Sequence, residues 1–357
     1  MAIQYLSGNR ATGTASDRAG LTTYSTKSWV ELGRTTLTST SSTIAVEGIT
    51  TTDYDHLMIL SRNLVNSDHN MTYSTGNGSY PSSGNNYCDR RSENGGSDAT
   101  TTNRSDNGII TDAHTQEMFT VGNMANYDGE EKLVIWHSVG DNTDGANNAP
   151  DRFECVGKFT GTSKIDRLKL NNSSSINNEV GSEMIILGAK SSGTDNSQGF
   201  WRELANVTYS GGDTLDSGTI TAKKYLWVRI HGIANGNFDN CKIRFNGDSG
   251  SNYSYRHNSN GAGDSANTSD SGINYVGTNG AEDHFVDMFI VNNSDKEKLA
   301  HIEQLRASDA GASNNPARKE LAGKWAKTDQ QITSVQAVNG GSGDFASGST
   351  IQIWGSD

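Results

Sequence analysis

Two Asp-rich loops are the clearest clusters of side chains that could do chemistry. One is Asn246-Gly247-Asp248-Ser249-Gly250, and the other is Asp141-Asn142-Thr143-Asp144-Gly145. Clustered carboxylate and amide oxygens are the ligands that hard cations such as calcium prefer. Neither loop has the spacing of a calcium-binding loop or its terminal glutamate, and Asn, Asp and Gly also occupy turns for conformational reasons alone. The loops therefore predict turns and no cofactor, with calcium binding as the alternative.

Tyrosines among polar residues could instead stack on sugar rings. Tyr253 and Tyr255 follow the loop that contains Asn246 and Asp248, and these four residues are our candidate surface-loop contact. A stacking platform requires an exposed aromatic face. The alternative is that the tyrosines are strand residues that pack inside the protein. The same two interpretations apply to Tyr80, Tyr87 and Tyr275.

The sequence contains no Gly-x-Ser-x-Gly elbow, no Walker loop and no His-Glu-x-x-His motif. Its eight histidines show no metal-ligand spacing, and we expect His56 and His137 to have ordinary surface or core roles. The three cysteines, an odd number without a close pair, predict free thiols rather than a disulfide or a zinc site. We expect no enzymatic activity. An enzyme such as a polysaccharide depolymerase would need a carboxylate pair in a cleft, and it ranks below the two non-enzymatic functions considered at the end of this section.

Composition and charge narrow the class of protein further. Hydrophobic residues make up 32% of the 357, and the formal net charge is −12. Binding to nucleic acid or to an anionic membrane requires clustered Lys and Arg, so we expect neither partner. No apolar run is long enough for a transmembrane helix, and the first ten residues lack the pattern of a signal peptide. We therefore expect synthesis in a cytoplasm without export by that route.

An internal duplication is visible in the sequence. Short motifs return in the same order at a nearly constant spacing of about 166 residues, which is much longer than the repeat of a solenoid. Each copy should therefore be a whole domain with its own core. The matches include Trp29-Val30-Glu31-Leu32 with Trp201-Arg202-Glu203-Leu204, Asn86-Tyr87 with Asn252-Tyr253, Asn94-Gly95 with Asn260-Gly261, Glu131-Lys132-Leu133 with Glu297-Lys298-Leu299, and Gly157-Lys158-Phe159 with Gly323-Lys324-Trp325.

The duplication predicts the domain organisation. We expect an N-terminal arm at 1–25, a first copy at 26–190, a linker at 191–197 and a second copy at 198–357. It also aligns Cys155 with Leu321 and Cys241 with Met71, so each cysteine is equivalent to an apolar residue of the other copy. This favours core packing for both thiols.

The elements that must position these residues are β-strands. Apolar or β-rich segments of four to eight residues alternate with Gly, Asn, Asp and Ser, which is the pattern of strands and turns. Residues 299–305 are ambiguous because Leu299, Ile302 and Leu305 have helical spacing. Their counterpart at 133–139 is β-branched and aromatic, so we predict strands in both copies. The expected fold is all-β, with two tandem antiparallel, jelly-roll-like β-sandwiches.

Two segments resemble known proteins. The opening segment, residues 1–10, resembles the start of many structural proteins of marine tailed bacteriophages, notably those that infect cyanobacteria. Residues 243–254 look like a motif in β-domains of phage tail, fibre and head-surface proteins, where the chain closes on a short strand and a glycine, as residues 348–355 do here. The first copy departs from the pattern, because residues 73–80 keep the Gly/Asn turn but lose the Asp.

The resemblance implies a virion structural protein, such as a capsid decoration or fibre subunit, located on the particle after synthesis in the host cytoplasm. Its partners would be other virion proteins and further copies of itself in a homo-oligomer, for example a trimer. The alternative is a carbohydrate-binding adhesin or receptor-binding tail protein. Particle attachment is expected from the apolar cluster Ile3-Gln4-Tyr5-Leu6, which could add a strand to a neighbouring sheet. The other possibility is that this arm folds back on the first copy.

Overall fold

In the computed structural model, the secondary structure of the described residues consists entirely of strands and turns, and every pair of named strands is antiparallel. Among these residues there is no helix with the length and hydropathy required to cross a membrane. The predicted linker at 191–197 and most of the predicted arm lie outside the described part of the chain. The described residues are 4–6, 10–12, 29–65, 71–81, 84–104, 108–111, 117–172, 176–190, 199–278, 282–307 and 315–357.

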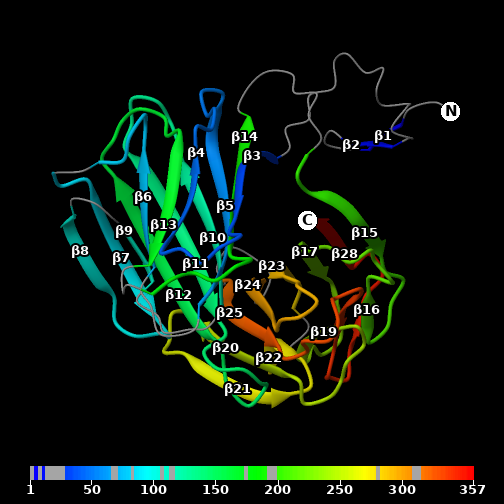
Figure 1. The fold of residues 1–357 in the computed structure, drawn as a ribbon. Helices are drawn as coiled ribbons and strands as arrows, with labels where there is room; N and C mark the ends of the chain where they lie inside the picture. Colours follow the sequence, from blue (N-terminus) through cyan, green and yellow to red (C-terminus); the bar gives the residue numbers. More distant parts are fainter. Residues whose placement is uncertain are drawn as a thin grey trace.

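The first copy consists of an eight-stranded and a four-stranded sheet (Figure 1). In spatial order the larger sheet contains β3 (Trp29–Thr36), β14 (Glu183–Lys190), β5 (Tyr54–Leu64), β10 (Glu117–Ala125), β11 (Lys132–Gly140), β12 (Asp151–Phe159), β7 (Tyr87–Glu93) and β8 (Ala99–Arg104). The smaller sheet contains β4 (Thr43–Glu47), β13 (Arg167–Asn172), β6 (Met71–Gly76) and β9 (Gly108–Thr111).

The second copy repeats this arrangement strand for strand. Its larger sheet contains β15 (Arg202–Thr208), β28 (Thr350–Ser356), β17 (Tyr225–Gly232), β23 (His284–Val291), β24 (Lys298–Arg306), β25 (Ala317–Trp325), β20 (Tyr253–Ser259) and β21 (Ser265–Asp270). Its smaller sheet contains β16 (Thr214–Asp216), β26 (Val335–Val338), β19 (Asp239–Phe245) and β22 (Ile273–Thr278). Two further short pairs are β18 (Ala234–Asn235) with β27 (Asp344–Phe345) and β1 (Gln4–Leu6) with β2 (Arg10–Thr12).

The equal strand order confirms the predicted fold class of two tandem antiparallel β-sandwiches. The ambiguous segment is strand β24, and it occupies the same place in its sheet as β11 does in the first copy. Residues three apart in a strand face opposite sides of the sheet. The helix-like spacing therefore means that the three apolar residues are distributed over both faces of β24. Leu299 is buried against the other copy, Ile302 is in the core of its own sandwich, and Leu305 is exposed.

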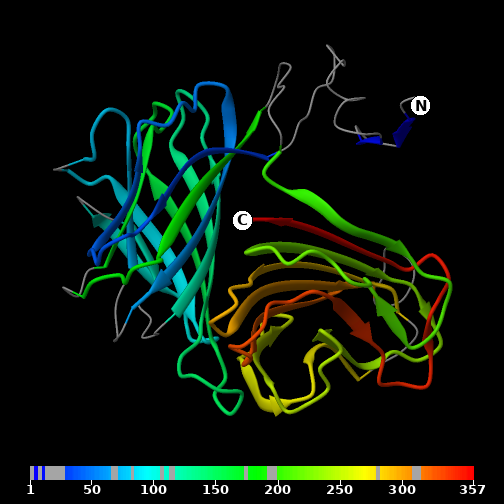
Figure 2. The same ribbon diagram turned by 45° about the vertical axis from the view of Figure 1, so that its right-hand side comes forward.

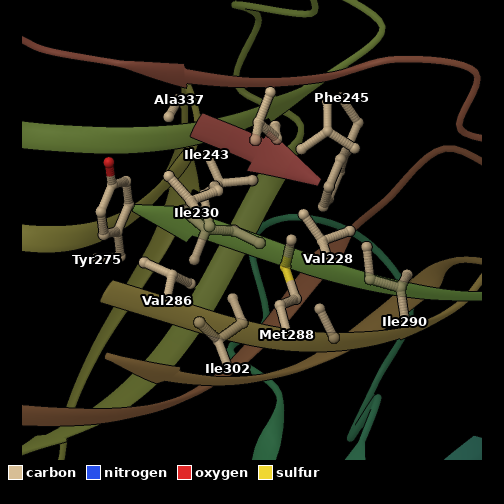
Figure 3. Packing of buried hydrophobic residues seen from close by; sticks show 14 of the residues in the cluster. Val228, Ile230, Ile243, Phe245, Tyr275, Val286, Met288, Ile290, Ile302 and Ala337 are labelled. Atoms are coloured by element: carbon tan, nitrogen blue, oxygen red, sulfur yellow. The ribbon is translucent and has the colours of Figure 1, made fainter. Parts of the chain in front are cut away.

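Each sandwich has its own apolar core between its two sheets. The core of the second copy is drawn in Figure 3, where Val228, Ile243, Met288 and Ile302 come from both sheets and point toward one another. Cys155 is buried in the core of the first copy and Cys241 in that of the second, at positions where the other copy has an apolar residue. All three cysteines are free, and burial raises the pKa of the Cys241 thiol to about 12.

The repeated Glu-Lys-Leu motif has a structural explanation. The fully buried ammonium group of Lys132 donates hydrogen bonds to the carbonyl oxygens of Tyr127, Glu130 and Thr162. Lys298 does the same in the second copy, with the carbonyl oxygens of Lys296 and Lys327. A buried ammonium group requires such acceptors, and the repeated lysine has them in both copies.

Two other repeated motifs also serve the fold. The hydroxyl group of Tyr87 donates to the carbonyl oxygen of Thr75 (3.0 Å), and that of Tyr253 donates to the carbonyl oxygen of Phe245 (3.3 Å), which ties the two sheets together in each copy. The repeated Gly157 lies where a Cβ atom would come within 2.5 Å of the Tyr73 hydroxyl, so a larger residue would displace this tyrosine of the facing sheet.

The eight-stranded sheets of the two copies pack against each other through their outer faces. The strands of the two sheets cross rather than run alongside each other (Figure 2). A third apolar cluster joins the sheets, and we call this contact the junction. Its members from the first copy are Met58, Leu60, Phe119, Val121, Val139, Ile185 and Leu187, and those from the second are Phe200, Tyr225, Phe289, Val291, Leu299 and Ala322.

We expect Arg152→Met to destabilise the protein by about 3 to 5 kcal/mol, because this substitution leaves a buried carboxylate without its charge partner. The guanidinium group of Arg152 lies in the junction, with 5% of the side chain exposed, and contacts Asp264 of the second copy at 2.6 Å. The equivalent residue of the second copy, Arg318, is 55% exposed and pairs with Glu320, so Arg318→Met should change stability by less than about 1 kcal/mol. Urea denaturation of both variants measures the difference, and equal losses would contradict the structural role of the junction.

Candidate functional site

The loop predicted to contact a ligand at Asn246 and Asp248 is a turn whose oxygens are already used. Asn246 has a φ of 54°, and its side-chain oxygen accepts hydrogen bonds from the backbone N–H groups of Thr333 and Ser334. The carboxylate of Asp248 accepts hydrogen bonds from Trp325 Nε1 (2.8 Å) and Asn252 Nδ2 (2.8 Å). Partial burial opposes ionisation of Asp248, but these donors hold its pKa below the usual value. The geometry therefore favours the turn interpretation of this loop over calcium binding.

The interpretation of Tyr253 and Tyr255 as exposed sugar-stacking residues is wrong. Both rings are almost completely buried in the second sandwich because the smaller sheet covers them. The hydroxyl group of Tyr255 contacts Asp270 and Asn267, which satisfies it inside the protein. Tyr87 and Tyr275 are buried in the same way.

The second Asp-rich loop, Asp141–Gly145, is part of the junction. The buried ammonium group of Lys324 donates to the carbonyl oxygens of Asp141 (3.0 Å) and Thr143 (2.6 Å), and it lies 3.2 Å from the Glu297 carboxylate. Glu297 in turn accepts a hydrogen bond from the backbone N–H of Gly145 (2.7 Å). Burial raises the pKa of Asp141 to about 7. The loop oxygens thus bind a lysine of the other copy.

Further charged groups converge at the junction from both copies. The buried carboxylate of Glu183 accepts hydrogen bonds from Tyr225 Oη and Lys224 Nζ, each at 2.8 Å. Burial opposes the ionisation of Glu183, but Lys224 and its other donors lower the pKa of this carboxyl. On the first copy's side, Arg152 contacts Glu320 at 3.3 Å as well as Asp264. Glu183 and Arg152 therefore each meet an opposite charge from the other copy.

The structure brings together a histidine cluster that the sequence did not predict. His137 of β11 and His301 of β24 stack with ring centroids 4.4 Å apart and planes 23° apart. The Nε2 atom of each ring lies 3.7 Å from Glu303 Oε1. In the described part of the chain, these side chains form a group of three that could hold a metal ion. Ligands of one ion direct their in-plane lone pairs to a common point, so the stacked rings would have to turn before they could bind a metal.

Sequence reasoning missed these clusters because their members lie in different copies. The sequence signal that could have indicated a contact between the copies was a difference in their outward-facing residues. At outward-facing positions the second copy has Phe289 and Val291, whereas the first has Asn123 and Ala125.

The outer face of the first copy also carries an open groove of about 760 Å³. Leu133, Ile135 and Val156 line its apolar floor, and all three are exposed. Trp29 lies at one end of the groove and Arg90 at the other side. An apolar groove of this size on an outer sheet face is suited to contact with another molecule.

We expect the stability of the protein to fall between pH 6.5 and pH 4, in part through His137. Burial and the neighbouring His301 lower the pKa of His137 from 6.5 to about 4. The unfolded chain therefore binds a proton in this pH range that the folded protein does not bind, and acid favours unfolding. His137→Gln should recover on the order of 2 kcal/mol of the loss at pH 5.

The control for this prediction is His56→Gln, which changes an exposed histidine of the same sheet. Urea titrations at pH 7 and pH 5 give the free energy of unfolding of each variant. The same acid-induced loss in His137→Gln as in the unsubstituted chain would refute the assignment.

No protein-family model matches the sequence, and no curated protein is similar to it at a significant level. Two solved structures have a distant likeness to this fold. One is the mouse laminin alpha1 chain, domains LG4-5, with 10% identity, a TM-score of 0.21, and coverage of 91% of this chain and 89% of that one. The other is the LG1-3 region of the laminin alpha2 chain, with 8% identity, a TM-score of 0.20, and coverage of 88% and 64%. The assignment of the two β-sandwiches depends on the strand pairing described above.

Proposed function

We propose that this protein is a non-enzymatic structural protein of a virus particle, displayed on the head or tail as a decoration or fibre subunit. The observation that carries the proposal is that the buried charged side chains contact the other copy of the sandwich. Arg152 and Glu183 form ion pairs across the junction, and Lys324 donates hydrogen bonds across it to carbonyl oxygens of the first copy, which holds the two sandwiches together. The groove on the outer face of the first copy remains open, with an apolar floor, as expected of a protein that acts by contact with other proteins.

The virion setting depends on the resemblance that residues 1–10 and 243–254 suggest to structural proteins of marine tailed bacteriophages. The proposed partners are other virion proteins. We propose that the arm attaches the protein to them. Gln4–Leu6 forms strand β1, which pairs with β2 (Arg10–Thr12), whereas Ile3 lies outside the described residues. A hairpin of this kind has an edge that can pair with a strand of a neighbouring protein.

A second candidate function, binding of a host-surface glycan, is favoured by a polar hollow in the second copy. This hollow has a volume of about 540 Å³. Its lining includes Asn240, Lys242, Asn267, Asp270 and Asn274. Lys242 pairs with Asp270 and Asn274 donates to Asn240, so these amide and charged groups would exchange their present partners for sugar hydroxyls.

The glycan candidate predicts that Asn274→Ala weakens binding to host-surface polysaccharide by about tenfold, the loss of one or two hydrogen bonds. The matched control is Asn206→Ala, which removes an exposed amide of the same copy outside the hollow. Binding is measured by isothermal titration with extracted polysaccharide. If the unsubstituted chain shows no binding, the glycan candidate is excluded.

For the structural function, we expect the full chain to bind purified particles and the chain without residues 2–20 to fold but not to bind. The physical reason is that the arm, and not the sandwiches, supplies the strand that docks on the particle. Immunogold labelling of particles and co-sedimentation measure the association, and circular dichroism checks the fold.

A control chain keeps the length of the arm but replaces Ile3, Tyr5 and Leu6 by serine. It should behave like the deletion if the apolar cluster is the anchor. Normal binding of the deletion variant would show that the arm is not the anchor, and the absence of the unsubstituted chain from particles would contradict the virion function.

A further inference from the structure

The junction joins two faces that are not equivalent. The first copy contributes the outward side chains of β5, β10 and β14 and the end of β11, and we call this surface face A. The second copy contributes outward side chains of β17, β23, β24 and β25, which we call face B; they are Tyr225, Phe289, Val291, Leu299 and Ala322. A contact between different patches of two equivalent units is heterologous, and it leaves one patch free on each unit.

The free face B of the first copy is the apolar groove. Strand pairing identifies the equivalent positions, because Leu133 lies opposite Lys158 and Leu299 lies opposite Lys324 in matching strands. Leu133 is 57% exposed, whereas Leu299 is fully buried. The residues equivalent to face B all line the groove; they are His56, Asn123, Ala125, Leu133 and Val156.

The free face A of the second copy is also exposed. Phe285 and Leu305 occupy the positions of Phe119 and Val139, and they are 40% and 48% exposed. Elsewhere this face is more polar than its counterpart, since Arg229 and Asp287 replace Leu60 and Val121. These two residues pair with each other at 3.0 Å, so their charges neutralise locally.

A repeated ion pair marks the same site in both copies. In the second copy, Lys324 and Glu297 are buried and are covered by the Asp141–Gly145 loop. In the first copy, the equivalent Lys158 and Glu131 form the same pair at 2.9 Å, but both side chains are more than a third exposed. The first copy thus has the apolar floor and the ion pair of face B without the cover that the second copy has.

We propose that face A of the second copy of one chain docks on face B of the first copy of another chain, which repeats the internal junction between molecules. The occupant is a second copy of this chain because the protein itself contains the template: the same two kinds of face, already packed together once. Since the contact is heterologous, it extends head to tail and produces a ring if the rotation closes and a filament if it does not. The inference rests on the proposed structural function and identifies how subunits would meet.

Sedimentation velocity of the full chain over a range of concentrations tests the proposal. We expect self-association, and we expect Leu133→Glu and Leu305→Glu each to weaken it by about tenfold or more, because a charge would be buried in the contact. The matched control is Val180→Glu, which introduces the same charge at a 56% exposed apolar residue outside both faces and should leave association unchanged. A chain that stays monomeric at every concentration would overturn the proposal.

Cross-linking tests the pairing of the faces. At the internal junction the rings of Phe119 and Tyr225 stack with centroids 6.2 Å apart, and the equivalent residues between molecules are Phe285 and His56. In a Cys88→Ser background, a mixture of Phe285→Cys and His56→Cys chains should form dimers with a short bis-maleimide, whereas either variant alone should not. Dimers of one variant alone would show that the groove makes a different contact between molecules. Self-association that appears only after deletion of residues 2–20 would show that the arm occupies the groove.

The outcomes separate this inference from the proposed function. A monomeric chain that still binds purified particles would refute the self-association and leave the virion function intact. A chain that self-associates through these faces but is absent from particles would refute the virion function alone.

Discussion

Charged side chains that are buried between the two eight-stranded sheets need partners, and this requirement determines how the two copies are placed. Arg152, Glu183 and Lys324 are all removed from water, and each has partners in the other copy: Arg152 meets the Asp264 carboxylate, Glu183 accepts hydrogen bonds from Tyr225 and Lys224, and Lys324 donates to the carbonyl oxygens of Asp141 and Thr143. An unpaired charge at these positions would cost several kcal/mol. A sliding movement of one sheet over the other would break all three sets of contacts together. The apolar cluster of the junction supplies the buried apolar surface area, and the charged side chains restrict the two sheets to one arrangement.

The duplication has preserved the interior of each sandwich more strictly than its outer face. Lys132 and Lys298 bind turn carbonyls, and Tyr87 and Tyr253 tie the sheets together, in the same way in both copies. These groups are buried and cannot change without a loss of hydrogen bonds. The outward positions differ more between the copies because they lie outside the sandwich cores and do not carry these hydrogen bonds. Their divergence produced an apolar face on the second copy, which requires a cover.

This divergence connects the fold with the proposed function. Two identical outer faces would favour a symmetric contact that uses both faces completely. The observed junction is asymmetric, so a groove remains on the first copy and two exposed apolar side chains remain on the second. Exposed apolar area of this kind is costly in an isolated molecule and is useful in a particle, where neighbouring subunits cover it. The Asp-rich loops, which could be mistaken for cation sites, stabilise turns and the junction.

The sequence by itself determined the duplication, the strands and the core positions of Cys155 and Cys241. These features depend on local signals: alternation with a period of two, Asn-Gly turns such as Asn94-Gly95, and motifs repeated at constant spacing. Only the tertiary structure decided that Tyr253 and Tyr255 are buried and that His137, His301 and Glu303 meet. The burial of the tyrosines depends on a second sheet that covers them. The histidine cluster depends on how two sheets cross, and residues more than a hundred positions apart leave no periodic pattern from which such a contact could be predicted.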